Sequence, residues 1–180
     1  METFGQLFED TLKDVYYAEK AILKALPKMA KKANSKKLQA AFTRHEAETE
    51  RQVERLERVF QLIGKRAAGK KCPGIDGILQ EGQELMHEAE DESIRDAAML
   101  AAAQAVEHYE ISRYGTLISW AKRMDIGQAA KLLEETLEEE KATDGKLTEL
   151  AESEVNIEAE ATGAGEAEEQ PRRKATGRRN

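Results

Sequence analysis

The chain has few of the residues that build strands, disulfides or membrane spans. It holds 1 Cys, 3 Pro and 12 Gly in 180 residues, and aromatic residues make up 5%. The single cysteine, Cys72, excludes an intrachain disulfide. Runs of β-branched and aromatic residues bounded by turn signals, which are typical of strands, do not persist anywhere. The sequence therefore predicts an all-α protein.

Long hydrophobic runs and an excess of positive charge are also lacking. The most apolar stretch, around Ala97 to Val106, is far shorter than the roughly 20 residues that a membrane-spanning helix needs. The N-terminus METFGQLFED does not have the basic region and apolar core of a signal peptide. A formal net charge of -7 argues against a globally nucleic-acid-binding surface. These features predict a soluble, cytoplasmic protein with no membrane association.

What the chain does have is helical periodicity. Apolar residues recur at three- and four-residue spacing in four long stretches, and 35% of the residues are charged. Ser35 is a candidate N-cap and Gly64 a natural helix stop. The predicted helices cover residues 3–33, 35–64, 93–124 and 126–155, with a shorter amphipathic helix at 75–89 in the connection between the second and third.

This order of elements favours two helical hairpins joined by a long crossover. That arrangement is a four-helix bundle of the ferritin-like topology, which we assign to residues 1–157. Residues 158–180 contain small, acidic and then basic residues that do not support a core, so they predict a disordered tail. The segment PRRKATGRR in this tail leaves open weak binding to nucleic acid.

Carboxylates interrupt the predicted buried face of each long helix near its middle. Several ionised carboxylates in one apolar interior repel each other unless something neutralises them, and divalent cations do so. Oxygen-rich sites with some imidazole suit Fe²⁺ or Mn²⁺, so a di-iron or manganese site is predicted. The candidate metal ligands are Glu19, His45, Glu48, Glu107, Glu110, Glu140 and Asp144.

The pattern departs from the Glu-x-x-His motif of ferritin-like di-metal proteins. Thr143 follows Glu140 by three residues and Arg51 follows Glu48, where the motif has histidine. An alternative therefore stays open, in which the buried carboxylates form a non-catalytic hydrogen-bonded network with tyrosines, His45 and Arg113.

Two segments, AAAQAVEHYEISRYGTL and AAKLLEETLEEEKATDGKLTELA, resemble the YciE/YciF family of bacterial ferritin-like stress proteins. YYAEKAILKALPKMA and HEAETERQVERLERVF are similar to the family's first two helices, so the resemblance covers residues 3–157. It implies a ferritin-like four-helix bundle, a homodimer, a role in stress responses and a rubrerythrin-like di-metal site at the seven residues above. It does not specify a reaction or a redox partner.

Overall fold

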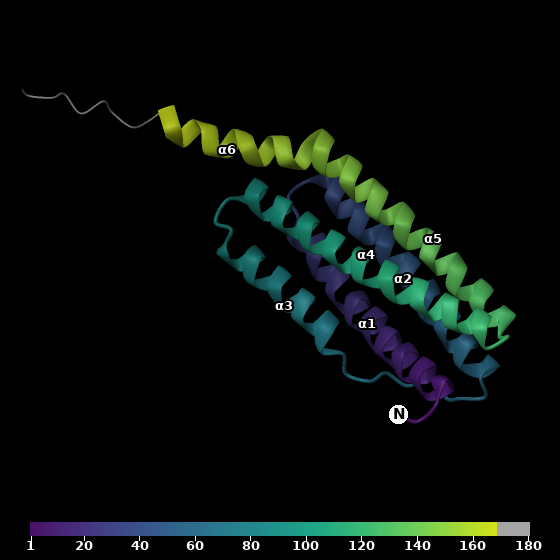
Figure 1. Cartoon of the computed structure of the whole chain (residues 1–180). Coiled ribbons are helices and arrows are strands. Elements are labelled where there is room, and N and C mark those ends of the chain that lie inside the picture. Colours follow the sequence, from purple (N-terminus) through teal and green to yellow (C-terminus); the bar gives the residue numbers. More distant parts are fainter. Residues whose placement is uncertain (169–180) are drawn as a thin grey trace, which may run out of the picture.

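The described part of the chain is entirely helical. The computed structural model describes residues 1–168, with side chains as far as Thr162. No strand occurs in this range, and none of its helices is long and apolar enough to cross a bilayer (Figure 1). The elements are α1 (Phe4–Lys32), α2 (Lys36–Leu62), α3 (Pro73–Glu88), α4 (Glu92–Arg123), α5 (Gly127–Leu150), a π-helical turn (Ala151–Val155) and α6 (Asn156–Glu168).

Local chemistry fixes the ends of α2 where the sequence predicted them. The Ser35 hydroxyl accepts a hydrogen bond from the Leu38 amide at 3.3 Å, which caps the first turn. Beyond the last turn, Gly64 has a φ of 69°, a left-handed conformation that glycine adopts without steric cost. The sequence-based boundaries of this helix are confirmed.

Two antiparallel hairpins, α1–α2 and α4–α5, form the four-helix bundle, and α2 also packs against α5 (Figure 1). Two clusters of apolar side chains form the core of the bundle. The first cluster lies at the end where α1 and α5 begin and α2 and α4 end, and it includes Phe8, Leu12, Leu56, Phe60 and Leu117. The second cluster lies at the opposite end and includes Leu26, Leu38, Phe42, Met99 and Leu147. Residues 63–91 cross from one end to the other, so the predicted ferritin-like topology is confirmed.

The crossover helix α3 lies outside the bundle, closely packed on α4. A Cβ atom at Gly82 would stand 2.7 Å from the Cβ of Ala102 on α4, a distance that real side chains do not tolerate. Glycine at this position therefore allows the two helices to approach, whereas α3 packs only sparsely on α1.

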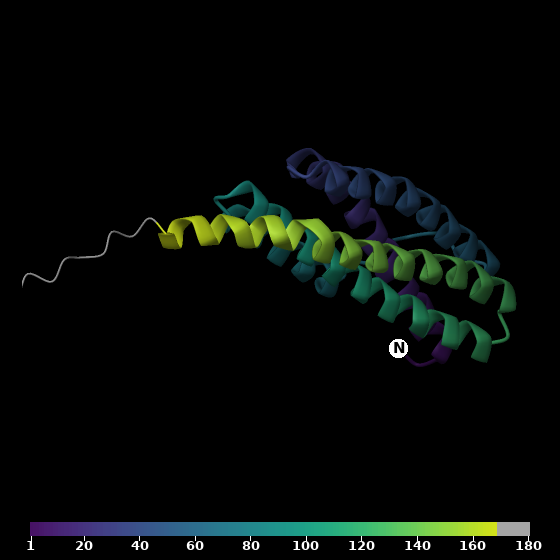
Figure 2. The same ribbon diagram turned by 90° about the horizontal axis from the view of Figure 1, so that it is seen from above.

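At its C-terminal end the chain stays helical past the predicted boundary at residue 157. After the π-helical turn, α6 continues to Glu168 along the direction of α5 (Figure 2). Ala151 and Val155 are buried in the second apolar cluster, and the Ser93 hydroxyl lies 2.8 Å from that of Thr162. The contact of Thr162 with Ser93 on α4 lies in a segment that composition alone assigned to a disordered tail. The rest of that prediction, including the basic segment, concerns residues 169–180, which lie outside the described residues.

Candidate metal centre

A layer of buried polar side chains separates the two apolar clusters. On each long helix it occupies the turn between the residues of one cluster and those of the other. These polar side chains point into the bundle because they follow the same three- and four-residue spacing as the apolar core residues of each helix. Five buried residues form this layer, which we call the acidic layer. They are Glu19 from α1, His45 from α2, Glu107 and Glu110 from α4, and Glu140 from α5.

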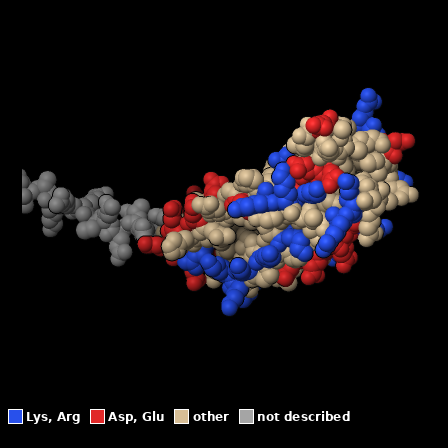
Figure 3. Space-filling model, turned by 90° about the horizontal axis from the view of Figure 1, so that it is seen from below, with Lys and Arg blue, Asp and Glu red and all other residues tan. Residues whose placement is uncertain are grey.

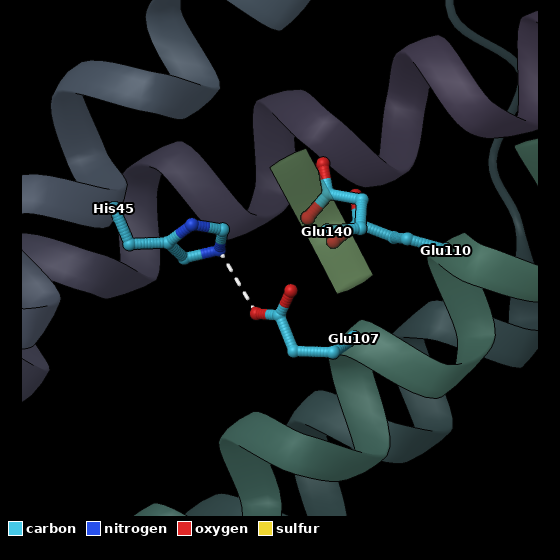
Figure 4. A group of neighbouring side chains, drawn as sticks. All are labelled: His45, Glu107, Glu110 and Glu140. Atoms are coloured by element: carbon cyan, nitrogen blue, oxygen red, sulfur yellow. Dashed lines mark ion pairs between the residues drawn. The ribbon is translucent and has the colours of Figure 1, made fainter. Parts of the chain in front are cut away.

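Four of these side chains converge on one point. His45, Glu107, Glu110 and Glu140 each offer an atom that could ligate a metal, and these atoms all lie within 4.8 Å of one another. Figure 4 shows the His45 ring from α2 facing Glu107, with Glu110 and Glu140 grouped beside it. The His45 Nε2 atom is 3.1 Å from Glu107 Oε1, an ion-pair distance. The group could hold a metal ion.

The acidic layer is almost completely removed from water. The exposed fraction is 0% for Glu19 and Glu140, 1% for Glu107 and Glu110, and 6% for His45. Burial disfavours the charged form of a carboxyl group. It raises the pKa of Glu19 to about 7, although the hydrogen bond from Tyr114 and the nearby His45 act in the opposite direction.

The neighbouring carboxylates intensify this effect at the centre of the layer. Burial and the nearby charges of Glu19 and Glu107 raise the pKa of Glu110 well above its ordinary value. Burial, together with the charges of Glu110, Glu19 and Glu107, does the same for Glu140. Burial lowers the pKa of His45, but the contacts with Glu107 and Glu48 outweigh it and raise that pKa to about 10. Among the five residues of the acidic layer, His45 is thus the one basic group, and its positive charge pairs with the neighbouring carboxylates.

Many polar atoms of the layer have no hydrogen-bond partner among the described residues. Buried oxygens and nitrogens without partners are rare in folded proteins, because each costs about 1–3 kcal/mol. Here they belong to side chains that all serve as ligands for divalent metals. The donor set therefore fits a metal centre. The unpartnered atoms are Glu19 Oε2, Glu107 Oε2, Glu110 Oε1 and both carboxylate oxygens of Glu140, while the two ring nitrogens of His45 have only ion-pair contacts with Glu107 and Glu48.

Two of the seven predicted ligands lie at the edge of the layer. Glu48 is half-buried. Its Oε2 accepts a hydrogen bond from the Thr143 hydroxyl at 3.3 Å and lies 3.9 Å from His45 Nδ1. Asp144 is 3.3 Å from Nε2 of His108, an exposed residue, with which it forms an ion pair. The structure thus brings Glu48 next to His45 but directs one oxygen of Asp144 away from the convergent group.

The sequence interpretation named Tyr114 together with Tyr16, Tyr17 and Tyr109 as tyrosines that could tune a metal centre, but it favoured packing for all four. The Tyr114 side chain is fully buried and its hydroxyl donates a hydrogen bond to Glu19 Oε1. Its position one turn beyond Glu110 on the same helix face was the available signal. Arg113, named in the alternative network, instead stacks on the Tyr109 ring at 5.2 Å. It supplies no hydrogen bond to the carboxylates of the acidic layer.

Comparisons with known proteins agree with this fold over nearly the whole described chain. The family described as "Domain of unknown function (DUF892)" matches residues 3–160. Protein YciF of Escherichia coli (strain K12) is 45% identical over 161 residues, covering 89% of this chain and 97% of that protein. The crystal structure of the E. coli stress protein YciF matches with a TM-score of 0.82 and 45% identity, over 87% of this chain and 99% of the other. YcfI from Rhodopseudomonas palustris matches with a TM-score of 0.80 and 46% identity, over 82% and 94%.

Proposed function

Because the chain belongs to the DUF892 family and to the family of E. coli YciF, we propose that it is a bacterial stress-response protein with a di-metal centre. The acidic layer would bind two redox-active divalent ions, iron or manganese, that react with peroxide or oxygen. The stress role follows the description of the E. coli relative as a stress protein. The metal centre is supported by this chain's own residues.

The observation that carries the proposal is the set of unpartnered ligand atoms in a layer that is buried from bulk solvent. Four carboxylates, from Glu19, Glu107, Glu110 and Glu140, stand together with one imidazole. If all four were ionised and His45 were neutral, as a ligand must be, two divalent cations would balance the charge. A ligand set rich in oxygen with one nitrogen suits Fe²⁺ or Mn²⁺ better than softer metals.

The surrounding residues would hold and tune such a centre. Tyr114 donates to Glu19 Oε1, which orients that carboxylate and leaves Oε2 free for a ligand role. Thr143 similarly fixes Glu48 beside His45. The two apolar clusters exclude bulk water from both ends of the layer, which strengthens every electrostatic interaction inside it. When bound, two such ions would supply reversible one-electron chemistry for reduction of peroxide or oxygen.

Metal stoichiometry tests this proposal directly. Metal-free protein reconstituted with Fe²⁺ under anaerobic conditions, and separately with Mn²⁺, should retain about two ions per chain by elemental analysis. Glu140→Gln should lose at least half of the bound metal, because the amide nitrogen replaces a carboxylate oxygen. The matched control is Glu138→Gln, two positions earlier on the same helix. Glu138 is exposed and pairs only with Lys141 among the described residues, so this variant should retain the full amount.

Thermal unfolding supplies a second, independent readout. Metal at a hundredfold excess over its dissociation constant should stabilise the folded chain by about 3 kcal/mol. A stoichiometry near zero with no change in Tm would instead favour the non-catalytic helical bundle. The homodimer implied by the family resemblance stays a prediction, which light scattering of the purified chain would measure. Nucleic-acid binding through the basic segment also stays a prediction.

A further inference from the structure

A mainly apolar pocket lies between α1, α3 and α4, and only its inner end touches the acidic layer. Its volume is about 460 Å³, within the range of roughly 300–1,000 Å³ that small-molecule sites occupy. The pocket exists because α3 packs closely on α4 at Gly82 but only sparsely on α1. Its walls are mainly aliphatic, and they include Ile22, Leu26, Met29, Ile78, Leu79 and Val106.

The inner end of this pocket reaches the acidic layer. His45 and Glu107 belong to its lining, although both are more than nine-tenths buried. Both His45 nitrogens and Glu107 Oε2 lack hydrogen-bond partners among the described residues. The pocket is therefore a passage from the surface toward the candidate metal centre, with aliphatic walls and a polar end.

The outer rim carries positive charge. Lys24, Lys28 and Lys32 line the pocket from α1 at four-residue spacing, and all three are exposed. None of the three forms an ion pair with a described residue. Figure 3 shows the molecule from below, where Lys and Arg side chains run across the middle of the face with Asp and Glu side chains among and around them. The lysines that do form ion pairs in the described range are Lys13, Lys37, Lys65, Lys70, Lys71, Lys122 and Lys141.

The shape of the pocket favours a long, narrow occupant. Its lining follows α1 from Ala21 to Lys32, eleven steps that cover roughly 17 Å at 1.5 Å per residue. An occupant must match aliphatic walls along this length and unpaired ammonium groups at one side of the mouth. A single alkyl chain with one anionic headgroup meets both requirements, because the chain is buried against the aliphatic walls while the headgroup pairs with an ammonium group at the rim.

We propose that this pocket binds a free aliphatic carboxylate of the fatty-acid class. The carboxylate headgroup pairs with Lys28, the middle lysine of the rim, and the alkyl chain extends between α1 and α3 toward His45 and Glu107. Binding does not require metal in the acidic layer, so it stands or falls separately from the proposed metal centre.

Isothermal titration calorimetry of the metal-free full chain with dodecanoate tests the site. Octanoate, with four fewer methylene groups, should bind about a hundredfold more weakly if the chain is buried. Lys28→Glu should weaken dodecanoate binding by about tenfold. Lys31→Glu makes the same charge change on the same helix at an exposed position outside the pocket and should alter affinity by less than about twofold.

A second variant places the alkyl chain inside the pocket. Ala25 is a half-buried lining residue, so Ala25→Phe should fill part of the cavity and reduce dodecanoate binding, with metal stoichiometry unchanged. Equal binding of dodecanoate and dodecyltrimethylammonium would overturn the role of the lysine rim. Equal losses in the Lys28 and Lys31 variants would overturn the location. Binding to phosphatidylglycerol vesicles without binding to free dodecanoate would show a membrane-facing surface and overturn the proposal.

Discussion

Two of the three carboxylates that helix α4 buries, Asp96 and Glu110, are buried in contrasting ways, and the contrast identifies the candidate site. Asp96 is 2% exposed, but its Oδ2 accepts a hydrogen bond from the Ser35 amide at 2.6 Å and its Oδ1 accepts one from the Asn34 amide at 2.9 Å. Glu110, fourteen residues later, is equally buried, yet its Oε1 has no partner among the described residues. Burial of a carboxylate alone is therefore no sign of a metal centre, whereas burial with unsatisfied oxygens is.

The neighbouring residues Glu139 and Glu140 on α5 show the same difference between a carboxylate with hydrogen-bond partners and one without. Glu139 accepts two hydrogen bonds from the Arg55 guanidinium, each at 2.6 Å. Glu140 lies one residue further along and has no partner for either oxygen. Asp96 and Glu139 are thus satisfied by backbone amides and by a guanidinium. Only in the acidic layer are the carboxylates left facing one another.

The largest expected effect of this difference is on the pH dependence of the metal-free protein. Glu19 has a folded-state pKa of about 7, above its ordinary 4.5, and the pKa values of Glu110 and Glu140 are also raised well above the ordinary value. Such groups stabilise the fold at low pH, and this contribution is lost as the pH rises through their folded-state pKa values. The free energy of unfolding should therefore fall by about 3 kcal/mol between pH 5 and pH 8, measured by urea denaturation.

His45 acts in the same direction over part of this range. Its pKa rises from 6.5 to about 10, so its stabilising contribution is complete below pH 6.5 and is lost toward pH 10. Glu48 and Glu139, whose pKa values are lowered, oppose the trend only as the pH falls below about 4.5. Glu19→Gln is the control and should flatten the profile. A metal-free wild type whose stability is constant or rises from pH 5 to pH 8 would contradict this account of the layer.

A smaller effect is expected where the buried carboxylate is satisfied. Asp96→Asn places an amide nitrogen near backbone N–H groups that need an acceptor, and Ser35 is itself buried. The loss of a charge-assisted hydrogen bond should cost about 2 kcal/mol and lower Tm by about 6 °C. Metal stoichiometry should stay at the wild-type value, because Asp96 lies outside the acidic layer. If Asp96→Asn lost metal while keeping its Tm, Asp96 would be a metal ligand and not a structural hydrogen-bond acceptor.

Most of the fold could be predicted from local signals in the sequence. Ser35 and Gly64 act at short range, so the ends of α2 were visible in the sequence itself. The extension of α6 past residue 157 was not visible, because it depends on α4. Val155 is buried against that helix and Thr162 contacts Ser93 across it. Such a long-range contact cannot be predicted from a local composition that is rich in small and acidic residues.

The candidate site was predicted as a set of helix positions rather than as contacts. Periodicity placed Glu19, Glu107, Glu110 and Glu140 on inward faces, and the structure buries all four. Periodicity did not distinguish Glu140 from Glu139, one residue away, because the guanidinium that pairs with Glu139 comes from a different helix. Which oxygens are satisfied depends on the helix-to-helix distances, which no single segment of sequence contains.

The smallest effect is expected for the same amide substitution within the acidic layer. In the metal-free protein, burial and the neighbouring carboxylates raise the pKa of Glu110 well above its ordinary value, which favours the neutral acid near pH 6. Glu110→Gln replaces one neutral side chain with another of similar shape, so the free energy of unfolding should change by less than about 0.5 kcal/mol. As the pH is raised to 8, the variant should become the more stable protein, because it has no carboxyl group to ionise. With Mn²⁺ added, the order should reverse, since wild type gains stability from the metal and the variant gains little. Urea denaturation at the two pH values, with and without metal, measures all four cases. A cost as large as that of Asp96→Asn in the metal-free protein would show that Glu110 has a hydrogen-bond partner and that the layer is a structural network.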